Sequence, residues 1–192
     1  MPKGNAKGSA FERSIATALS LWWSGNYRDD WFYRTAGSGG RATMRAKRGK
    51  TTSNSAGDIG ATTPEGGKLL SVVTYELKRG YNGTNLQDLI DKPDGPAIIR
   101  KFLDQAKDSA ALAGTKLWAI IWRRDRREPI FVGNHDPSRG VMMESMSMQL
   151  RMPDGTVIYV LPFGSVVSET ARDFYQDAII NDKRASEKDI VL

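Results

Sequence analysis

The segment Gly57–Lys78, GDIGATTPEGGKLLSVVTYELK, decides the fold that the sequence predicts. Asp58–Thr63 and Leu69–Lys78 have the character of two short strands, and Pro64-Glu65-Gly66-Gly67 between them is a strong turn signal. We therefore expect the two strands to form a hairpin.

The polar residues of this hairpin fall at particular positions. Glu76 and Lys78 are two residues apart, so on a strand they project from one face, whereas Leu77 points the other way. Asp58 begins the first strand and faces Glu76 if the hairpin is centred on Gly67. This pairing would place two carboxylates and one ammonium side by side.

The flanking segments supply further helices and strands. Before the hairpin we expect a helix over Ala10–Trp23, a strand over Trp31–Thr35 and a loop over residues 36–57. After it we expect a helix from Pro96 to a Gly114 cap, strands over Leu117–Trp122, Ile130–Val132 and Val157–Leu161, and a helix over Ser168–Ile180.

The resulting order, α-β-β-β-α-β over roughly residues 9–122, predicts an α/β fold in which helices flank a mixed central sheet. Further β and α elements follow toward the C-terminal end. We expect one domain over residues 1–192, with a core at about residues 9–133 and an extension at about 134–192.

The composition restricts the chemistry of any site. The 192 residues are 40% hydrophobic and 26% charged, which is ordinary for a globular protein. They include no Cys and one His, His135, so a thiolate zinc site, a cysteine nucleophile and a His-rich metal cluster are excluded. A metal site must be built from oxygens, which favours Mg²⁺, Mn²⁺ or Ca²⁺.

The net charge of +6 is concentrated in one segment. Between Arg34 and Lys50 there is no acidic residue, and the six cations there are Arg34, Arg41, Arg45, Lys47, Arg48 and Lys50. Such a segment attracts polyanions, although a solvated loop without a partner has the same composition. Because no apolar run is long enough to span a membrane, we expect a protein of a cytoplasm-like compartment.

The carboxylates and the cations together point to phosphodiester hydrolysis. Paired carboxylates hold a hard divalent ion, which polarises a phosphodiester oxygen and lowers the pKa of a bound water. Lys78 on the same face would stabilise charge that develops on the phosphate. Glu12, one turn into the first helix, would lean over the sheet edge.

Each of these residues also has an ordinary structural interpretation. Glu12 lies three residues after Ser9 and would complete a capping box at the start of the first helix. Glu76 and Lys78 would be an exposed charge pair, and Asp58 a turn residue.

Two levels of resemblance follow from these residues. Gly57-Asp58 followed by Glu76-Leu77-Lys78, with Glu12 on a preceding helix, resembles the PD-(D/E)xK nuclease superfamily and its restriction-endonuclease-like fold. More narrowly, GSAFER at residues 8–13, YRTAGSG at 33–39 and GDI at 57–59 resemble archaeal and phage Holliday-junction resolvases.

The resemblance implies a role for each site residue. Asp58, Glu76 and the Leu77 carbonyl would ligate Mg²⁺, for which Mn²⁺ would substitute. Glu12 would bind the same or a second ion, Lys78 would contact the nucleophile and the scissile phosphate, and Gln105 would face the site. We expect DNA contacts from Arg13, Arg34, Ser38, Arg41, Arg45, Lys47, Arg48, Lys50 and Lys101.

The function implied is that of a Mg²⁺-dependent, structure-selective DNA endonuclease of the Holliday-junction resolvase kind. A homodimer is implied as well, since symmetric junction cleavage needs two active sites. Two alternatives stay open at this point: a restriction or repair nuclease of the same superfamily, and a nucleic-acid-binding protein without catalytic activity.

Overall fold

The computed structural model describes residues 4–35, 57–91, 96–138, 147–152 and 154–189. Its helices are α1 (Gly4–Trp23), α3 (Pro64–Leu70), α4 (Asp88–Asp91), α5 (Ala97–Ala113), α6 (Phe163–Val166) and α7 (Glu169–Asp189). Its strands are β1 (Phe32–Arg34), β2 (Ile59–Ala61), β3 (Val73–Arg79), β4 (Leu117–Arg123), β5 (Ile130–Gly133), β6 (Met148–Arg151) and β7 (Val157–Pro162).

The strands form a mixed sheet and a smaller ribbon beside it. The five-stranded sheet has the order β3-β4-β5-β7-β6, in which β3 and β4 are parallel and every other neighbouring pair is antiparallel. β1 and β2 pair antiparallel as a separate two-stranded unit. The predicted fold class, a mixed sheet flanked by helices, is confirmed.

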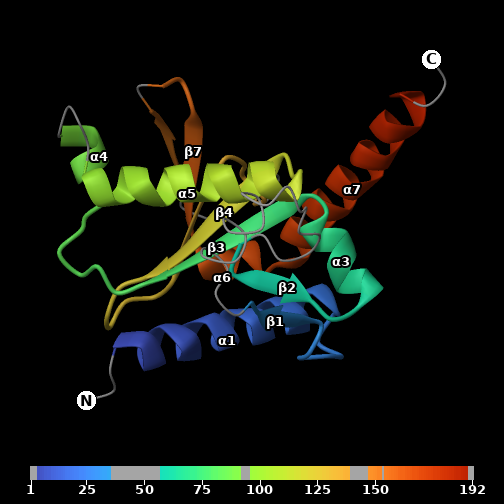
Figure 1. Cartoon of the computed structure of the whole chain (residues 1–192), viewed down its shortest axis with the longest axis horizontal. Coiled ribbons are helices and arrows are strands. Elements are labelled where there is room, and N and C mark those ends of the chain that lie inside the picture. The colour runs from blue at the N-terminus through green and yellow to red at the C-terminus, as the bar shows by residue number, and fades with distance from the viewer. Residues whose placement is uncertain (1–3, 36–56, 92–95, 139–146, 153, 190–192) are drawn as a thin grey trace, which may run out of the picture.

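Helices cover both faces of the sheet. α5 lies along the β3–β4 pair on one side, and α1 lies on the other side of β3 (Figure 1). Two separate hydrophobic clusters result. One joins α1, α7 and one face of β3, and the other joins α5 to β4, β5 and β7. β3 contributes Val73, Tyr75 and Leu77 to the first cluster, and its other face meets α5.

The long helix α5 follows the sequence pattern closely. The spacing predicts an apolar stripe of six residues, of which Ala113 in the last turn is exposed and five are buried: Ile99, Phe102, Leu103, Ala106 and Ala110. The helix ends where predicted, because Gly114 adopts the left-handed conformation with φ 74° and caps it. The apolar run in β4 is buried from Trp118 to Trp122, as expected for a central strand with neighbours on both sides.

Two sequence predictions at α1 are wrong. The helix begins at Gly4, not at Ala10. Ser9 consequently lies inside the helix and cannot cap its start, so the capping box with Glu12 does not form. Capping therefore does not account for Glu12.

The predicted hairpin is also wrong. Residues 64–70 form the helix α3, which Thr63 caps by accepting a hydrogen bond from the Gly66 backbone N–H over 3.1 Å. Pro64 occupies the first turn, where its missing N–H costs nothing. Pro and Gly mark a helix start as readily as a turn, and the Thr63 cap decides between them here. β2 accordingly pairs with β1, not with β3 as a hairpin neighbour.

The C-terminal part completes the same sheet. β7 lies close to where the sequence predicts it, and α7 begins near its predicted start but continues past Ile180 to Asp189. β6, whose residues MQLR are mostly exposed, was not expected. Most of the basic segment falls outside the described residues, and so does most of residues 141–148, a stretch with four methionines. Within the described ranges, no helix is both long and apolar enough to cross a membrane.

Candidate active site

Asp58 is held against β3 by a close backbone approach. The Asp58 N–H donates to the Tyr75 carbonyl over 2.8 Å, and Asp58 Oδ2 accepts from the Leu77 N–H over 2.8 Å. Gly57 makes this possible: it has φ +85°, and a Cβ there would lie 2.6 Å from the Tyr75 carbonyl oxygen. A side chain at position 57 would therefore push Asp58 off the strand.

Thr35, directly after β1, fixes the other side of the Gly57-Asp58 dipeptide. The Thr35 hydroxyl donates to the Gly57 carbonyl over 2.8 Å, and the Thr35 N–H donates to the Asp58 carbonyl over 3.0 Å. Thr35 is itself buried. The segment that carries Asp58 is thus bonded to β1 on one side and to β3 on the other.

Glu76 projects from β3 toward α5 and is almost completely buried, with 1% of its surface exposed. Its Oε1 accepts from the Ser109 hydroxyl over 2.7 Å, and its Oε2 accepts from Gln105 Nε2 over 2.6 Å. Lys78 Nζ contacts the same Oε2 at 3.2 Å and donates to Gln105 Oε1 over 2.8 Å. Glu76, Lys78 and Gln105 therefore form a closed triangle of polar contacts.

The electrostatics of the site depend on the proximity of the two carboxylates. Burial raises the pKa of Glu76, and the negative charge of Asp58 raises it further, while Lys78 and Ser109 act in the opposite direction. Asp58 bonds Tyr75 and Leu77, the two neighbours of Glu76 on β3, and this places the two acids close together. Their proximity, expected from a hairpin, results instead from the Asp58 backbone bonds to β3.

Glu12 lies outside this group of contacts. Its carboxylate is paired with the Arg34 guanidinium of β1, and both side chains are partly exposed. Among the residues that the structure describes, no set of three or more His, Cys, Asp or Glu side chains is placed to hold a metal ion. The structure thus brings together Asp58 and Glu76 and keeps Glu12 with Arg34.

The donors present nevertheless fit a hard divalent cation. The N–H and C=O of a strand residue point the same way, so the Leu77 carbonyl lies on the Asp58 side of β3. Two carboxylates and one carbonyl are oxygen donors of the kind that Mg²⁺ takes, and a cation near both acids would relieve their mutual repulsion. The fit covers Asp58, Glu76 and Leu77.

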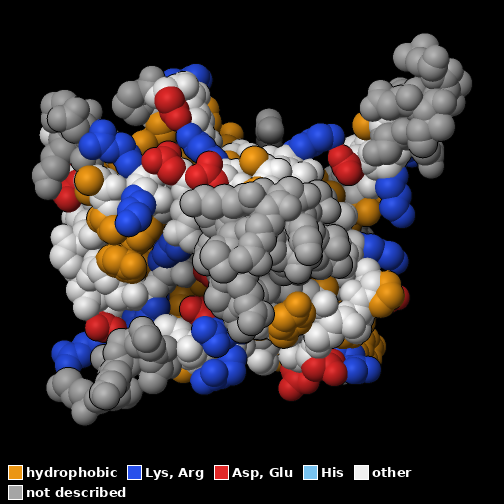
Figure 2. Space-filling view, in the orientation of Figure 1, with side chains coloured by type: hydrophobic (Ala, Val, Ile, Leu, Met, Phe, Trp, Pro, Cys, Tyr) orange, Lys and Arg blue, Asp and Glu red, His pale blue; other side chains and the backbone are white. Residues whose placement is uncertain are grey.

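The expected DNA-binding residues are only partly described. Arg13 and Lys101 are exposed on α1 and α5, and Arg34 is engaged by Glu12. The others lie outside the described residues: Ser38, Arg41, Arg45, Lys47, Arg48 and Lys50. On the face seen in Figure 2, Lys and Arg side chains mix with hydrophobic ones at the end of the molecule where β3 and β4 finish.

Two residues that position the site, Ser109 and Thr35, were not predicted from the sequence. Ser109 lies one turn after Gln105 on α5, so the spacing of four residues was the available signal for a shared face. Thr35 lies within the YRTAGSG stretch at 33–39, but its role depends on the approach of Gly57, which is distant in sequence, so no spacing indicates it.

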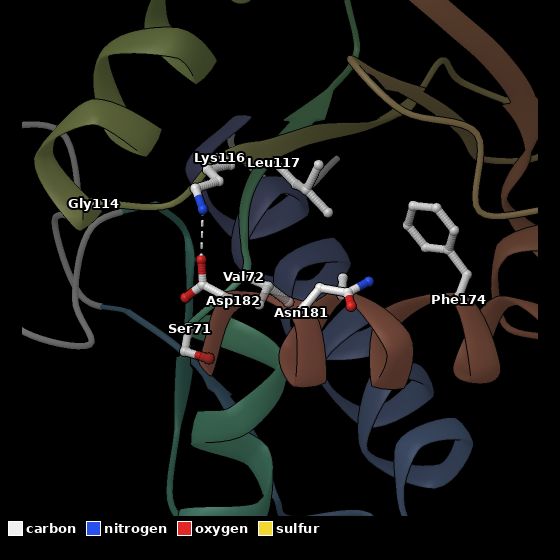
Figure 3. A pocket seen from close by; sticks show the side chains of 9 residues that line it. Ser71, Val72, Gly114, Lys116, Leu117, Phe174, Asn181 and Asp182 are labelled. Carbon is white, nitrogen blue, oxygen red and sulfur yellow. Dashed lines mark hydrogen bonds and ion pairs between the residues drawn. The ribbon is translucent and has the colours of Figure 1, made fainter. Parts of the chain in front are cut away.

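A cavity of about 210 Å³ lies elsewhere in the fold. It is found where β3 and β4 begin and α7 passes over them, and the Lys116–Asp182 ion pair of 2.8 Å crosses its rim (Figure 3). None of the site residues lines it, and its lining is mainly apolar. The carboxylate site and this cavity are thus separate features.

Comparison with known proteins places the chain in a family. Residues 3–158 match the model of a family described as "Phage putative PDDEXK endonuclease". No curated protein and no solved structure matches the chain. The matched range includes α1, β1 with the adjoining Thr35, the Asp58 segment, β3 and α5, which together supply every contact of the site described above. The chain therefore belongs to this phage PD-(D/E)xK endonuclease family.

Proposed function

We propose that this protein is a divalent-metal-dependent endonuclease that hydrolyses phosphodiester bonds in DNA. The observation that carries the proposal is that Asp58 bonds the Leu77 N–H of β3, next to the triangle of polar contacts that Glu76 and Lys78 of β3 form with Gln105 of α5. A buried carboxylate such as Glu76 next to a buried ammonium such as Lys78 costs free energy in a purely structural role, so the pair favours a catalytic one.

Asp58, Glu76 and the Leu77 carbonyl would hold Mg²⁺ or Mn²⁺. When bound, such an ion supplies a Lewis acid that polarises the phosphodiester and lowers the pKa of a water molecule. Isothermal titration of the protein with Mg²⁺ and Mn²⁺ tests this directly. We expect binding by the wild type and a large loss of affinity in Asp58→Asn.

The remaining polar residues orient the reacting groups. Lys78 holds its ammonium 3.2 Å from Glu76 Oε2 and would contact the scissile phosphate, where it stabilises developing negative charge. Gln105 accepts from Lys78 and donates to Glu76, so it fixes the separation of the two. Glu12 would join the site only by releasing Arg34, which then becomes available to a phosphate.

Branched DNA is the substrate class that we propose, and a four-way junction its foremost member. The support is the resemblance of residues 8–13, 33–39 and 57–59 to Holliday-junction resolvases. Two symmetric cuts would need two copies of the site, so we propose a homodimer. Light scattering of the purified protein, alone and with junction DNA, tests the dimer.

One observation favours a second candidate, a nucleic-acid-binding protein that does not cleave. The described carboxylates form a pair and not a trio, and both Glu76 oxygens already accept hydrogen bonds within the protein. In that case the basic segment would supply the affinity and the site would be structural.

A cleavage panel distinguishes the two candidates. Labelled four-way junction, flap, linear duplex and single strand are incubated with wild type and with Glu76→Gln, in Mg²⁺, in Mn²⁺ and in EDTA. We expect metal-dependent cleavage by the wild type, fastest on branched DNA, and a loss of about 10³-fold in Glu76→Gln.

Lys116→Met serves as the control, because it removes an exposed charge remote from the site. Binding without cleavage of any substrate by the wild type would support the second candidate. Equal cleavage rates on duplex and junction would support the nuclease proposal and contradict the proposed preference for junctions.

A further inference from the structure

An aromatic cluster extends from the candidate site to the protein surface. Lys78 Nζ lies 5.6 Å from the centroid of the Phe102 ring, and the Phe102 and Tyr81 rings meet edge to face with centroids 4.8 Å apart. The Trp122 ring also packs edge to face against Phe102, with centroids 6.0 Å apart, and the Arg124 guanidinium lies 5.8 Å from the centroid of the Trp122 ring. Two ring contacts therefore connect Lys78 with the solvent-facing Tyr81.

Tyr81 differs from the rings behind it. Phe102 and Trp122 are 4% and 3% exposed, whereas Tyr81 is 47% exposed. Its backbone has φ +58°, directly after Gly80 at φ +94°. A tyrosine in the left-handed region is uncommon and strained, and such residues persist where the surroundings hold them in place.

Hydrogen bonds of Gly80 and Asn82, the two neighbours of Tyr81, hold this segment in place. Asn82 exchanges two hydrogen bonds with Asp125, of 2.9 Å and 2.7 Å, which tie the segment after β3 to the turn after β4. The Gly80 N–H donates to the Arg123 carbonyl over 2.9 Å, and the Gly80 carbonyl accepts from the Trp122 indole over 3.1 Å. The exposed ring is thus carried on a fixed segment.

We propose that Tyr81 is a stacking platform for an unpaired base of the DNA, next to the phosphate held at Lys78; this rests on the proposed function. A base inside a duplex has both faces stacked, so only an unpaired or splayed base offers a face to a protein ring. Arg124 and Lys78 at either end of the cluster supply the cations that a nucleotide's phosphates require. The platform would make the enzyme selective for DNA with unpaired bases beside the cut.

The test measures binding of full-length protein in the Glu76→Gln background, so that the DNA stays intact. The probes are a duplex with one unpaired adenine, the same duplex with an abasic residue there, and the perfect duplex. Tyr81→Leu covers Phe102 without an aromatic face, Tyr81→Trp retains one, and Tyr27→Ala alters an 88% exposed tyrosine outside the cluster.

We expect the unpaired adenine to strengthen binding over the perfect duplex by about tenfold, the order of one aromatic–base stack. Either Tyr81→Leu or the abasic residue should remove this advantage, and the two together should remove no more. Tyr81→Trp and Tyr27→Ala should retain it. With 2-aminopurine as the unpaired base, binding should quench its fluorescence when the Glu76→Gln protein retains Tyr81. The quenching should be absent when Tyr81→Leu is added.

An unchanged advantage in Tyr81→Leu, or no advantage in the wild type, would overturn the platform. Neither outcome affects the nuclease proposal, which requires only that duplex or junction DNA is bound and cut. Failure to bind any DNA would contradict both. Circular dichroism and thermal unfolding of each variant establish that a loss of binding is not a loss of fold.

Discussion

The two faces of β3 both bury titratable groups, but one face surrounds them with charged and hydrogen-bonding partners and the other with a neutral core. Toward α5, Glu76 and Lys78 are surrounded by hydrogen-bonding and charged partners. Toward α1 and α7, Tyr75 packs into a core with Tyr175 and His135, whose pKa values are shifted toward the neutral forms by burial. One strand thus carries a polar site on one face and a neutral core on the other.

The difference teaches what burial requires of a polar group. His135 Nε2 bonds the Tyr175 hydroxyl over 2.7 Å, and its ring is stacked on Phe174, so neutral partners satisfy a neutral ring. Glu76 has Lys78 as an ion-pair partner in addition to neutral hydrogen-bond donors. A charged group buried without an opposite charge would adopt its neutral form.

Removing the ammonium should have the largest effect on this contrast. In Lys78→Met, Glu76 keeps two hydrogen bonds and loses its ion-pair partner, so we expect a loss of about 3 kcal/mol in the free energy of unfolding and loss of cleavage. Urea unfolding at pH 7 measures it. Lys116→Met, whose ion pair is exposed, should change stability by less than about 0.5 kcal/mol.

The double variant Lys78→Met/Glu76→Gln tests whether the loss in Lys78→Met comes from leaving the Glu76 charge unpaired. It removes both charges and should recover part of the stability without recovering cleavage. Equal stability of Lys78→Met and wild type would show that the two faces of β3 do not differ in the way described.

Gly57→Ala tests the close approach of the Asp58 segment to the edge of β3. The substitution combines a left-handed backbone with a Cβ 2.6 Å from the Tyr75 carbonyl oxygen, so we expect a loss of about 3 kcal/mol. Gly114→Ala is a matched control, because it has φ +74° and no atom within 4 Å. It should cost only about 1 kcal/mol. Similar losses in the two variants would contradict the close approach.

The neutral face predicts a pH dependence. Burial lowers the pKa of His135 from its ordinary 6.5 to about 3, so below pH 6.5 the unfolded chain takes up a proton that the folded chain does not. The free energy of unfolding should therefore decrease as the pH is lowered, by about 2 kcal/mol from pH 7 to pH 5. The raised pKa of Glu76 acts in the opposite direction.

Comparison of wild type with His135→Gln separates the two contributions. The variant should be less stable at pH 7 and should lack the decline between pH 7 and pH 5, as measured by urea unfolding at each pH. A parallel decline in both proteins would assign the pH dependence to other groups.

The smallest effect is expected from Ser109. In Ser109→Ala, Glu76 Oε1 loses a donor at 2.7 Å while Gln105 and Lys78 still hold Oε2, so we expect a loss of about 1 kcal/mol. Cleavage should persist and require more Mg²⁺. Ser14→Ala, whose hydroxyl bonds its own helix, is the control for serine removal. An unaltered Mg²⁺ requirement would show that Ser109 does not position Glu76.

Much of this arrangement was predictable from the sequence, for physical reasons. The stripe of α5 and the apolar run of β4 bury residues at regular spacing, and Gly114 caps the helix, so local patterns specify these elements. Glu76 and Lys78 share a face because strand geometry requires it. The fold class was predicted correctly on this basis.

The errors and omissions have a common origin. Pro64 and the glycines after it suit a turn and a helix start alike, and a Thr63 side-chain bond decides between them. The meeting of Asp58 with β3 depends on contacts between distant segments that no local pattern encodes. The Glu12–Arg34 pair is likewise a contact between α1 and β1, so the sequence could not show that Glu12 is already engaged.

The most direct test of the central claim, that Asp58 and Glu76 form a hydrolytic centre, is a parallel measurement of binding and cleavage in Asp58→Asn. Affinity for a labelled four-way junction is measured in EDTA, and single-turnover cleavage in Mg²⁺. We predict an affinity within a fewfold of wild type and a cleavage rate lower by about 10³-fold. Cleavage at the wild-type rate by Asp58→Asn would contradict the claim.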